Sequence, residues 1–178
     1  MQSPLRVSLA LAAIAAVMLS AAPGPVGAAT PPKSKPEFRA TLDKTSYAGG
    51  EPVMLTFTLN NTGREPVWVN TRFYLSSKTA PEDDREVYLI LTSPSGKELP
   101  CTFSYPTGFP KTDYFVRLEP GQEASSEHPR DVRGFFELKE PGTYTLQAVY
   151  HNVFGAELGL DAVKGPLESK PITFTISQ

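Results

Sequence analysis

The sequence is poor in the residues that usually carry chemistry or covalent cross-links. Its 178 residues include one cysteine, two histidines and one tryptophan. Because a lone cysteine, Cys101, cannot close a bridge within the chain, the fold must be held by its apolar core without a disulfide. We expect Cys101 to be a small buried residue, since no histidine or basic residue stands close to it in sequence to activate the thiol. An intermolecular disulfide or a reactive thiol is the alternative.

A surplus of charge of one sign is missing as well. Lys and Arg number 17 against 19 Asp and Glu, which leaves a formal net charge of −2. Nucleic acids and anionic membranes are bound by basic surfaces. The composition therefore favours neither as a partner.

Motifs of known catalytic or metal centres are absent too. The sequence contains no nucleophile elbow, G-x-S-x-G, and His128 and His151 lie far apart with no cysteine pair beside them. The acidic run at residues 81–86 lacks the spacing of a calcium loop and carries Arg85 as a counter-charge, so we interpret it as a solvated loop. The sequence predicts a protein that is not an enzyme and uses neither a metal nor another cofactor.

The only long apolar run stands at the N-terminus, at residues 7–22, after a single positive charge. It is shorter than the roughly 20 residues of a membrane span, and small residues before Ala28 resemble a cleavage site. We therefore predict a cleaved bacterial signal peptide at residues 1–28, a flexible leader at 29–36 and one domain at 37–178. The expected location is the periplasm or the medium. An uncleaved anchor is the alternative.

Period-two alternation of apolar and polar residues recurs along the remaining chain, at residues 37–42, 53–60, 87–91, 143–150 and 172–177. Such alternation places one set of side chains on a buried sheet face. Turn signals rich in glycine, proline and asparagine separate these segments, and no later segment keeps a helical apolar repeat over three turns. We predict an all-β fold: a two-sheet antiparallel sandwich of about seven to nine short strands.

Two aromatic residues resemble landmarks of the immunoglobulin-like superfold. Trp68, in the run PVWV, stands where such domains place a buried tryptophan, and Tyr144, in EPGTYTL, resembles the tyrosine corner. The resemblance implies that the Tyr144 hydroxyl bonds to upstream backbone. Leu146 occupies the position of an inter-sheet cysteine of antibody domains, where Leu55 or Phe57 would face it. The resemblance is therefore to the bacterial sandwiches that lack the bridge.

A narrower resemblance covers most of residues 50–150. The runs GEPVMLTFTLNNTG, PSGK, LEPGQE and PGTYTLQAVY resemble the bacterial proteinase inhibitors of the intracellular proteinase inhibitor type. They are also similar to the sandwich prodomains of deuterolysin-like metallopeptidases. The shared residues are mostly turn glycines, turn prolines and core positions, so they imply a fold. The most specific function that the resemblance implies is inhibition of a proteinase by a protruding loop.

The most distinctive candidate surface is the segment at residues 102–115, in which aromatic residues alternate with prolines and a glycine. Aromatic side chains on a proline-braced loop offer binding area at low entropic cost. We expect Phe103 and Phe115 to fold back on the domain. Tyr105 and Phe109, at the tip, are the expected contacts with a partner.

Phe154 is a further candidate contact, because it lies among glycines in a long connection at residues 153–165. These features predict an exported protein-binding module with an unidentified protein partner and no stable membrane anchor after cleavage. A structural or accessory domain of an envelope assembly is one alternative. A carbohydrate-binding or other small-ligand-binding module is the other.

The N-terminal interpretation predicts the mass of the exported protein. Expressed from the full chain in an exporting bacterium, the protein should lose residues 1–28 and begin at Ala29. Intact-mass spectrometry and N-terminal sequencing measure this directly. A protein that keeps Met1 and stays with the membrane would show an uncleaved anchor instead.

Overall fold

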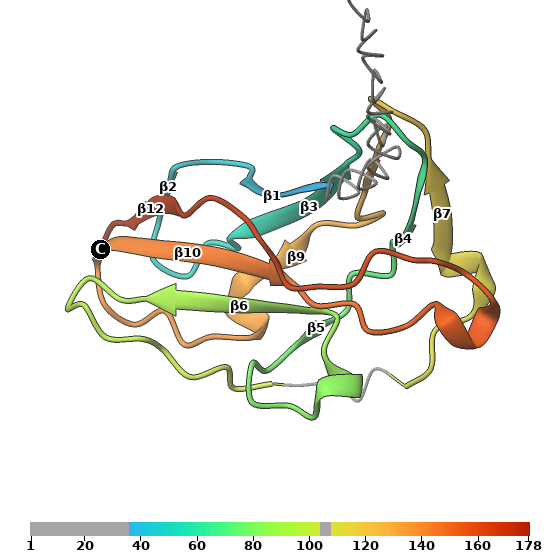
Figure 1. Cartoon of the computed structure of the whole chain (residues 1–178). Coiled ribbons are helices and arrows are strands. Elements are labelled where there is room, and N and C mark those ends of the chain that lie inside the picture. The colour runs from blue at the N-terminus through green and yellow to red at the C-terminus, as the bar shows by residue number, and fades with distance from the viewer. Residues whose placement is uncertain (1–35, 104–107) are drawn as a thin grey trace, which may run out of the picture. The chain divides into compact units, whose positions relative to one another are not determined.

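The computed structural model describes residues 36–103 and 108–178 (Figure 1). The predicted signal peptide, most of the predicted leader and Tyr105 lie outside these ranges. The described part of the chain contains twelve strands and four short 3-10 helices but no α-helix, and none of its helices is long and apolar enough to cross a membrane. The fold is therefore all-β.

More strands form than the alternation predicts, because several are very short. Seven strands in the described ranges have four or more residues. The other five are β2 (Ser46–Tyr47), β5 (Leu75–Ser76), β8 (Glu123–Ser125), β9 (Arg130–Asp131) and β11 (Leu167–Glu168). Segments of two or three residues are too short to show a period of two.

The first sheet is built around β3 (Met54–Asn60), with β1 (Glu37–Leu42) on one side and β8 and β9 on the other. Buried residues alternate along both long strands. The antiparallel register places Phe38 opposite Leu59 on the same buried face. This sheet therefore presents one apolar face to the core.

The second sheet is built around β10 (Gly142–Tyr150), flanked by β12 (Ile172–Ile176) and β6 (Val87–Thr92). Its order is β2-β12-β10-β6-β5, and β11 also pairs with β10. These long strands pair antiparallel, but β2 runs parallel to β12 and β5 runs parallel to β6. The expectation of purely antiparallel sheets is therefore wrong at these two edges. There, a two-residue strand runs in the same direction as the longer strand it pairs with.

A third, two-stranded sheet pairs β4 (Val67–Asn70) with β7 (Phe115–Leu118). On its other side, β4 is joined to the late connection, because the amide of Val163 donates to the carbonyl of Trp68 at 2.8 Å. Trp68 is only half-buried and packs against a small second cluster rather than the main core. The expectation of a fully buried tryptophan is wrong, because Val67 and Val69 of the same strand face the main core and the Trp68 side chain therefore lies on the other face.

The main core joins residues of both larger sheets in a single cluster. Phe38 and Phe57 of the first sheet and Tyr150 of the second surround Phe73, with ring centroids 5.7–6.5 Å apart. Leu146 is fully buried in this cluster. Burying such large rings supplies the stability that a disulfide-free domain needs.

Tyr144 closes one end of β10 through its hydroxyl. The hydroxyl donates to the carbonyl of Glu140 at 2.7 Å and accepts from the amide of Glu140 at 3.1 Å. Its ring stacks on Phe174 at 5.3 Å between centroids. Burial raises the pKa of Tyr144, so the hydroxyl keeps its proton for this bond.

The Tyr144 contact predicts a loss of stability when the hydroxyl is removed. Replacing Tyr144→Phe leaves the Glu140 backbone without its partner and should lower the free energy of unfolding by about 1–2 kcal/mol. Urea unfolding measures the change. Tyr88→Phe is the matched control, because Tyr88 is half-exposed on β6 and should lose much less. Equal losses in the two variants would contradict the assignment.

Candidate functional site

Of the aromatic residues described in this segment, Phe103 is more exposed than the sequence predicts. Phe109 is 56% exposed and Phe103 is 40% exposed, whereas Phe115 is buried. Phe103 contacts Phe135 edge-on, at 6.3 Å between ring centroids, and leaves part of its ring open. Phe103 therefore folds back only in part, because its ring contacts Phe135 but stays 40% exposed, while the expectation for Phe115 is confirmed.

Phe154 is buried and not exposed on the surface. It is 6% exposed and packs with Phe115 and Ala162 in the second cluster. Its ring lies edge-on to that of Phe109 at 5.3 Å between centroids. The prediction that Phe154 contacts a partner directly is therefore wrong. Its ring lies beneath Phe109 and limits the positions of that exposed ring.

A buried ion pair lies next to this segment. Arg72, in the loop after β4, and Glu86, just before β6, are 8% and 0% exposed. The guanidinium donates to Oε1 of Glu86 through Nε at 2.8 Å and also through Nη2. Glu86 belongs to the acidic run interpreted as a solvated loop, and for this residue the interpretation is wrong because Arg72 supplies its counter-charge inside the protein.

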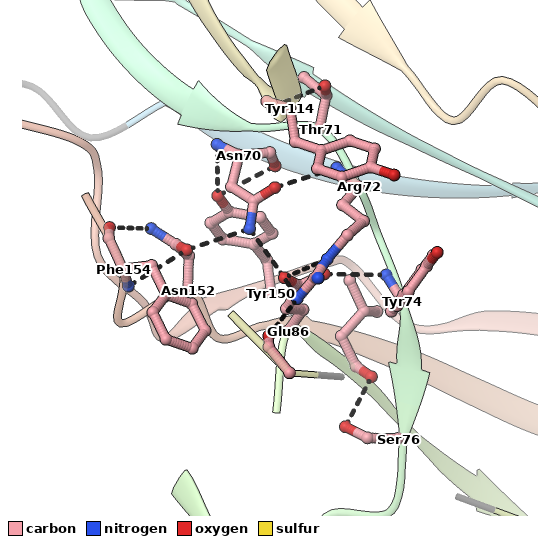
Figure 2. A network of polar contacts seen from close by, with 12 residues as sticks. Asn70, Thr71, Arg72, Tyr74, Ser76, Glu86, Tyr114, Tyr150, Asn152 and Phe154 are labelled. Atoms are coloured by element: carbon pink, nitrogen blue, oxygen red, sulfur yellow. Dashed lines mark hydrogen bonds and ion pairs between the residues drawn. The ribbon is translucent and has the colours of Figure 1, made fainter. Parts of the chain in front are cut away.

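The Glu86 carboxylate also accepts two further hydrogen bonds (Figure 2). Oε1 accepts a further bond from Nδ2 of Asn70 at 2.9 Å, and Oε2 accepts from the amide of Tyr74 at 3.2 Å. Its backbone carbonyl accepts from the amide of His151 at 2.6 Å. One residue thereby joins β4, the loop after it, β6 and the end of β10.

Two asparagines extend the network into the late connection (Figure 2). The amide of Asn70 donates to the Tyr150 hydroxyl at 3.1 Å, and its side chain donates to Oδ1 of Asn152 at 3.3 Å. Asn152 in turn donates to the carbonyls of Phe154 and Val163 at 2.8 and 2.9 Å. These bonds hold the backbone of Phe154 and with it the ring that supports Phe109.

Gly165 brings the end of this connection against β10. A Cβ at this position would lie 2.5 Å from the carbonyl oxygen of Tyr150 and 2.6 Å from Cα of His151. Both are backbone atoms, which cannot shift as a flexible side chain could. The connection can therefore follow this path only because residue 165 has no side chain.

Arg72 connects the ion pair to the aromatic segment itself. Its Nη2 donates to the carbonyl of Gly108 at 2.9 Å, directly before Phe109. Its guanidinium lies 4.7 Å from the ring centroid of Tyr74 and 5.7 Å from that of Tyr114. Tyr74 is 38% exposed. Arg72 thus fixes the backbone next to one exposed aromatic residue and stacks beneath another.

The opposite flank of the segment is fixed by Thr102. Its amide and hydroxyl both donate to the carbonyl of Phe135, at 2.7 and 3.0 Å. Cys101, before it, is half-buried, and its thiol donates to the carbonyl of Phe103 at 2.8 Å. Burial raises the pKa of the Cys101 thiol, which opposes formation of a reactive thiolate.

The two histidines lie in different surroundings within the described residues. His128 is exposed beside Glu127, and the imidazole of His151 lies 3.7 Å from Glu82 and against the ring of Tyr88. In residues 36–103 and 108–178, no three His, Cys, Asp or Glu side chains gather closely enough to hold a metal ion.

The buried pair predicts a pattern of stability changes. Glu86→Leu leaves the Arg72 charge buried without its partner and should lower the free energy of unfolding by about 3–5 kcal/mol. The double variant Arg72→Met/Glu86→Leu should recover part of this loss, because no unpaired charge remains. The exposed pair Arg39–Glu123 is the control, and Glu123→Gln should change the free energy by less than about 1 kcal/mol in the same urea titrations. A double variant no more stable than Glu86→Leu would contradict this account.

Sequence reasoning missed Arg72, Glu86 and Tyr74. Their only signal is a pair of charges next to two predicted strands, and such pairs also occur on ordinary surfaces.

Comparison with known proteins adds no assignment to this geometry. No protein-family model matches the chain, and no curated protein matches it.

Proposed function

We propose that the chain is an exported, non-enzymatic protein-binding module that contacts its partner through Phe109 and the aromatic residues near it. The observation that carries the proposal is that Phe109 is exposed while buried groups hold the segment that bears it. Phe109 is 56% exposed, yet Phe154 supports its ring and Arg72 binds the carbonyl directly before it. A large ring that is exposed and already ordered loses little entropy on binding.

Tyr74 enlarges this candidate surface. Its ring stacks on the guanidinium of Arg72, whose Nη2 binds Gly108, so Tyr74 and Phe109 are linked through one side chain. Exposed aromatic rings are enriched where proteins meet proteins. Phe103, on the other flank, offers a further apolar contact.

The architecture proposed for this module is an immunoglobulin-like sandwich. Three features support it: the two larger sheets contribute to one core, the Tyr144 hydroxyl bonds to upstream backbone, and the chain passes from the first sheet to the second between β1 and β2. In such domains the loops at the ends of the sheets are free to vary and bind. Export is proposed from the N-terminal sequence, with the periplasm or the medium as the location.

Inhibition of a proteinase is the sharpest version of this function. An inhibitory loop has to hold its shape in the enzyme cleft, and the hydrogen bonds from Arg72 to Gly108 and from Thr102 to Phe135 brace the two flanks. In this version, the captured partner is a proteinase and its activity falls on binding. In the broader version, the partner is another protein of the envelope.

The proposal predicts that one side chain dominates partner binding. The protein, expressed from the full chain, is immobilised and used to capture partners from an envelope fraction, and the affinity for the captured protein is then measured by calorimetry. Phe109→Ala should weaken binding by about tenfold or more, as expected for a central aromatic contact. Val116→Ala is the matched control, because Val116 is 39% exposed on β7 and outside the aromatic segment.

Two outcomes would contradict the proposal. One is undiminished binding by Phe109→Ala, which would remove the site. The other is a bait that repeatedly captures no protein. If the captured partner is a proteinase, its hydrolysis of a peptide substrate reports inhibition directly.

A further inference from the structure

The outer edge of β1 is open in the described part of the chain. Within these ranges β1 pairs only with β3, at one end of the sheet order β1-β3-β8. A groove of about 360 Å³ follows the edge, lined by residues 37–41 and by Glu168, Lys170 and Ile172. An open edge of this kind is a template for a further strand.

The phase of the β1–β3 ladder identifies the backbone groups that point outward. The amide of Asp43 donates to the carbonyl of Met54 at 3.1 Å, in register with the strand pairs. Since bonded positions alternate in an antiparallel ladder, the odd-numbered residues of β1 bond to β3. The amides and carbonyls of the even-numbered residues, Phe38, Ala40 and Leu42, therefore point toward the open edge.

The exposed side chains of this segment carry charges in an order that can complement itself. Arg39 and Asp43 stand two positions before and after Thr41, and all three are exposed. Among the described residues, Arg39 bonds to Glu123 through Nη2, which leaves Nε and Nη1 as donors. Asp43 accepts from the Tyr47 hydroxyl through Oδ1, at 2.7 Å, which leaves Oδ2 as an acceptor.

We propose that β1 pairs antiparallel with β1 of a second copy of the chain, about a two-fold axis at Thr41. In this register Arg39 of each copy lies opposite Asp43 of the other, so two pairs of opposite charge form. Thr41 faces its own equivalent across the axis. These odd-numbered positions are the non-hydrogen-bonded pairs of the new ladder, in which opposite side chains approach most closely.

The same register satisfies the backbone groups of the open edge. Ala40 of each copy lies opposite Leu42 of the other, and each such pair exchanges both of its N–H···O bonds. Leu42 is half-buried and packs against the core. Contact with Ala40 of the other copy removes more of the Leu42 side chain from water, which adds an apolar contribution to the polar ones.

The charges disfavour the neighbouring registers. Pairing about Ala40 would place Glu37 of one copy opposite Asp43 of the other, at both ends of the pair. Pairing about Arg39 or about Glu37 would place the same charge of both copies face to face. Like charges directly opposite each other destabilise a strand pair.

The backbone disfavours the registers that remain. Pairing about Phe38 matches charges, but it places Pro36, which has no amide proton, opposite Ala40, where a donor is required. Pairing about Leu42 would need residues 44–46, where the chain has already left β1 for β2. Thr41 is therefore the centre at which charges and backbone donors are both matched.

This contact is separate from the aromatic surface and goes beyond the function proposed above. A dimer built in this way carries two copies of Phe109. A partner with more than one binding site can then be held more tightly than by a single copy.

The proposal is tested by sedimentation equilibrium of the protein expressed from the full chain, over a range of concentrations. We expect a monomer–dimer equilibrium. Arg39→Asp and Asp43→Arg should each weaken dimerisation by about tenfold or more, because each variant places like charges opposite each other at two positions. An equal mixture of the two variants should dimerise as the wild type does, since every charge then faces its opposite.

Control variants separate this contact from effects within one copy. Glu123→Gln removes the internal partner of Arg39 and should leave dimerisation unchanged. Thr41→Lys should abolish the dimer by placing two ammonium groups at the axis, whereas Thr143→Lys, at an exposed threonine of β10, should have no effect. Thermal unfolding establishes that each variant is folded. Phe109→Ala should dimerise as the wild type does, so this test and the binding test are independent.

Amide hydrogen exchange gives a readout that needs no variant. As the concentration rises through the dimerisation range, the amides of Ala40 and Leu42 should exchange more slowly, because each donates across the new ladder. Protection of these amides only after an envelope extract is added would overturn the proposal in favour of a strand from another protein.

Three results of the sedimentation experiments would also overturn it. The first is a protein that stays monomeric at every concentration. The second is a mixture of Arg39→Asp and Asp43→Arg that does not dimerise although both variants are folded. The third is a dimer weakened by Glu37→Arg and not by Asp43→Arg, which would indicate pairing about Phe38 instead.

Discussion

The buried carboxylate of Glu86 is the constraint on which the aromatic end of the domain depends. Removing a charge from water costs several kcal/mol, and the cost is offset only when a counter-charge and further donors surround it. Arg72, Asn70 and Tyr74 supply them. Since these donors belong to the end of β4 and the loop after it, satisfying one carboxylate fixes the path of that loop against the start of β6. In a domain with no disulfide, such bonds take over the role of a cross-link.

Exposed rings can remain ordered at this end because the polar network and the second apolar cluster act together. The network holds two backbone positions next to Phe109. Arg72 binds the carbonyl of Gly108, directly before it, and Asn152 binds the carbonyl of Phe154, whose ring packs against it. The cluster then holds the Phe154 ring beneath Phe109. An exposed phenylalanine ordinarily samples several rotamers. At Phe109 the neighbouring groups restrict this side-chain motion. This combination is the physical reason for proposing Phe109 as a contact residue.

The sequence predicts the parts of this fold that depend on local pattern. Alternation finds the long strands, such as β3 and β10, because burial on one sheet face repeats every second residue. It misses the two-residue strands, and it misplaces Trp68 and Phe154, whose surroundings come from segments distant in sequence. Glu86 shows the reason most directly: its local context is acidic and turn-like, and the counter-charge that permits its burial comes from Arg72, 14 residues earlier. Separation of this kind leaves no periodic signal.

The edges of the two larger sheets differ in a way that bears on where a partner strand could add. The edge strands β2, β5, β8 and β9 of the described chain have only two or three residues each, and short edges are a common protection against unwanted pairing. β1 is twice as long or longer. The charge of Arg39 does little to protect it, since its guanidinium is bound to Glu123 of β8, beyond β3. Among the described edges of the two larger sheets, β1 is therefore the one whose length does least to oppose the pairing of a further strand.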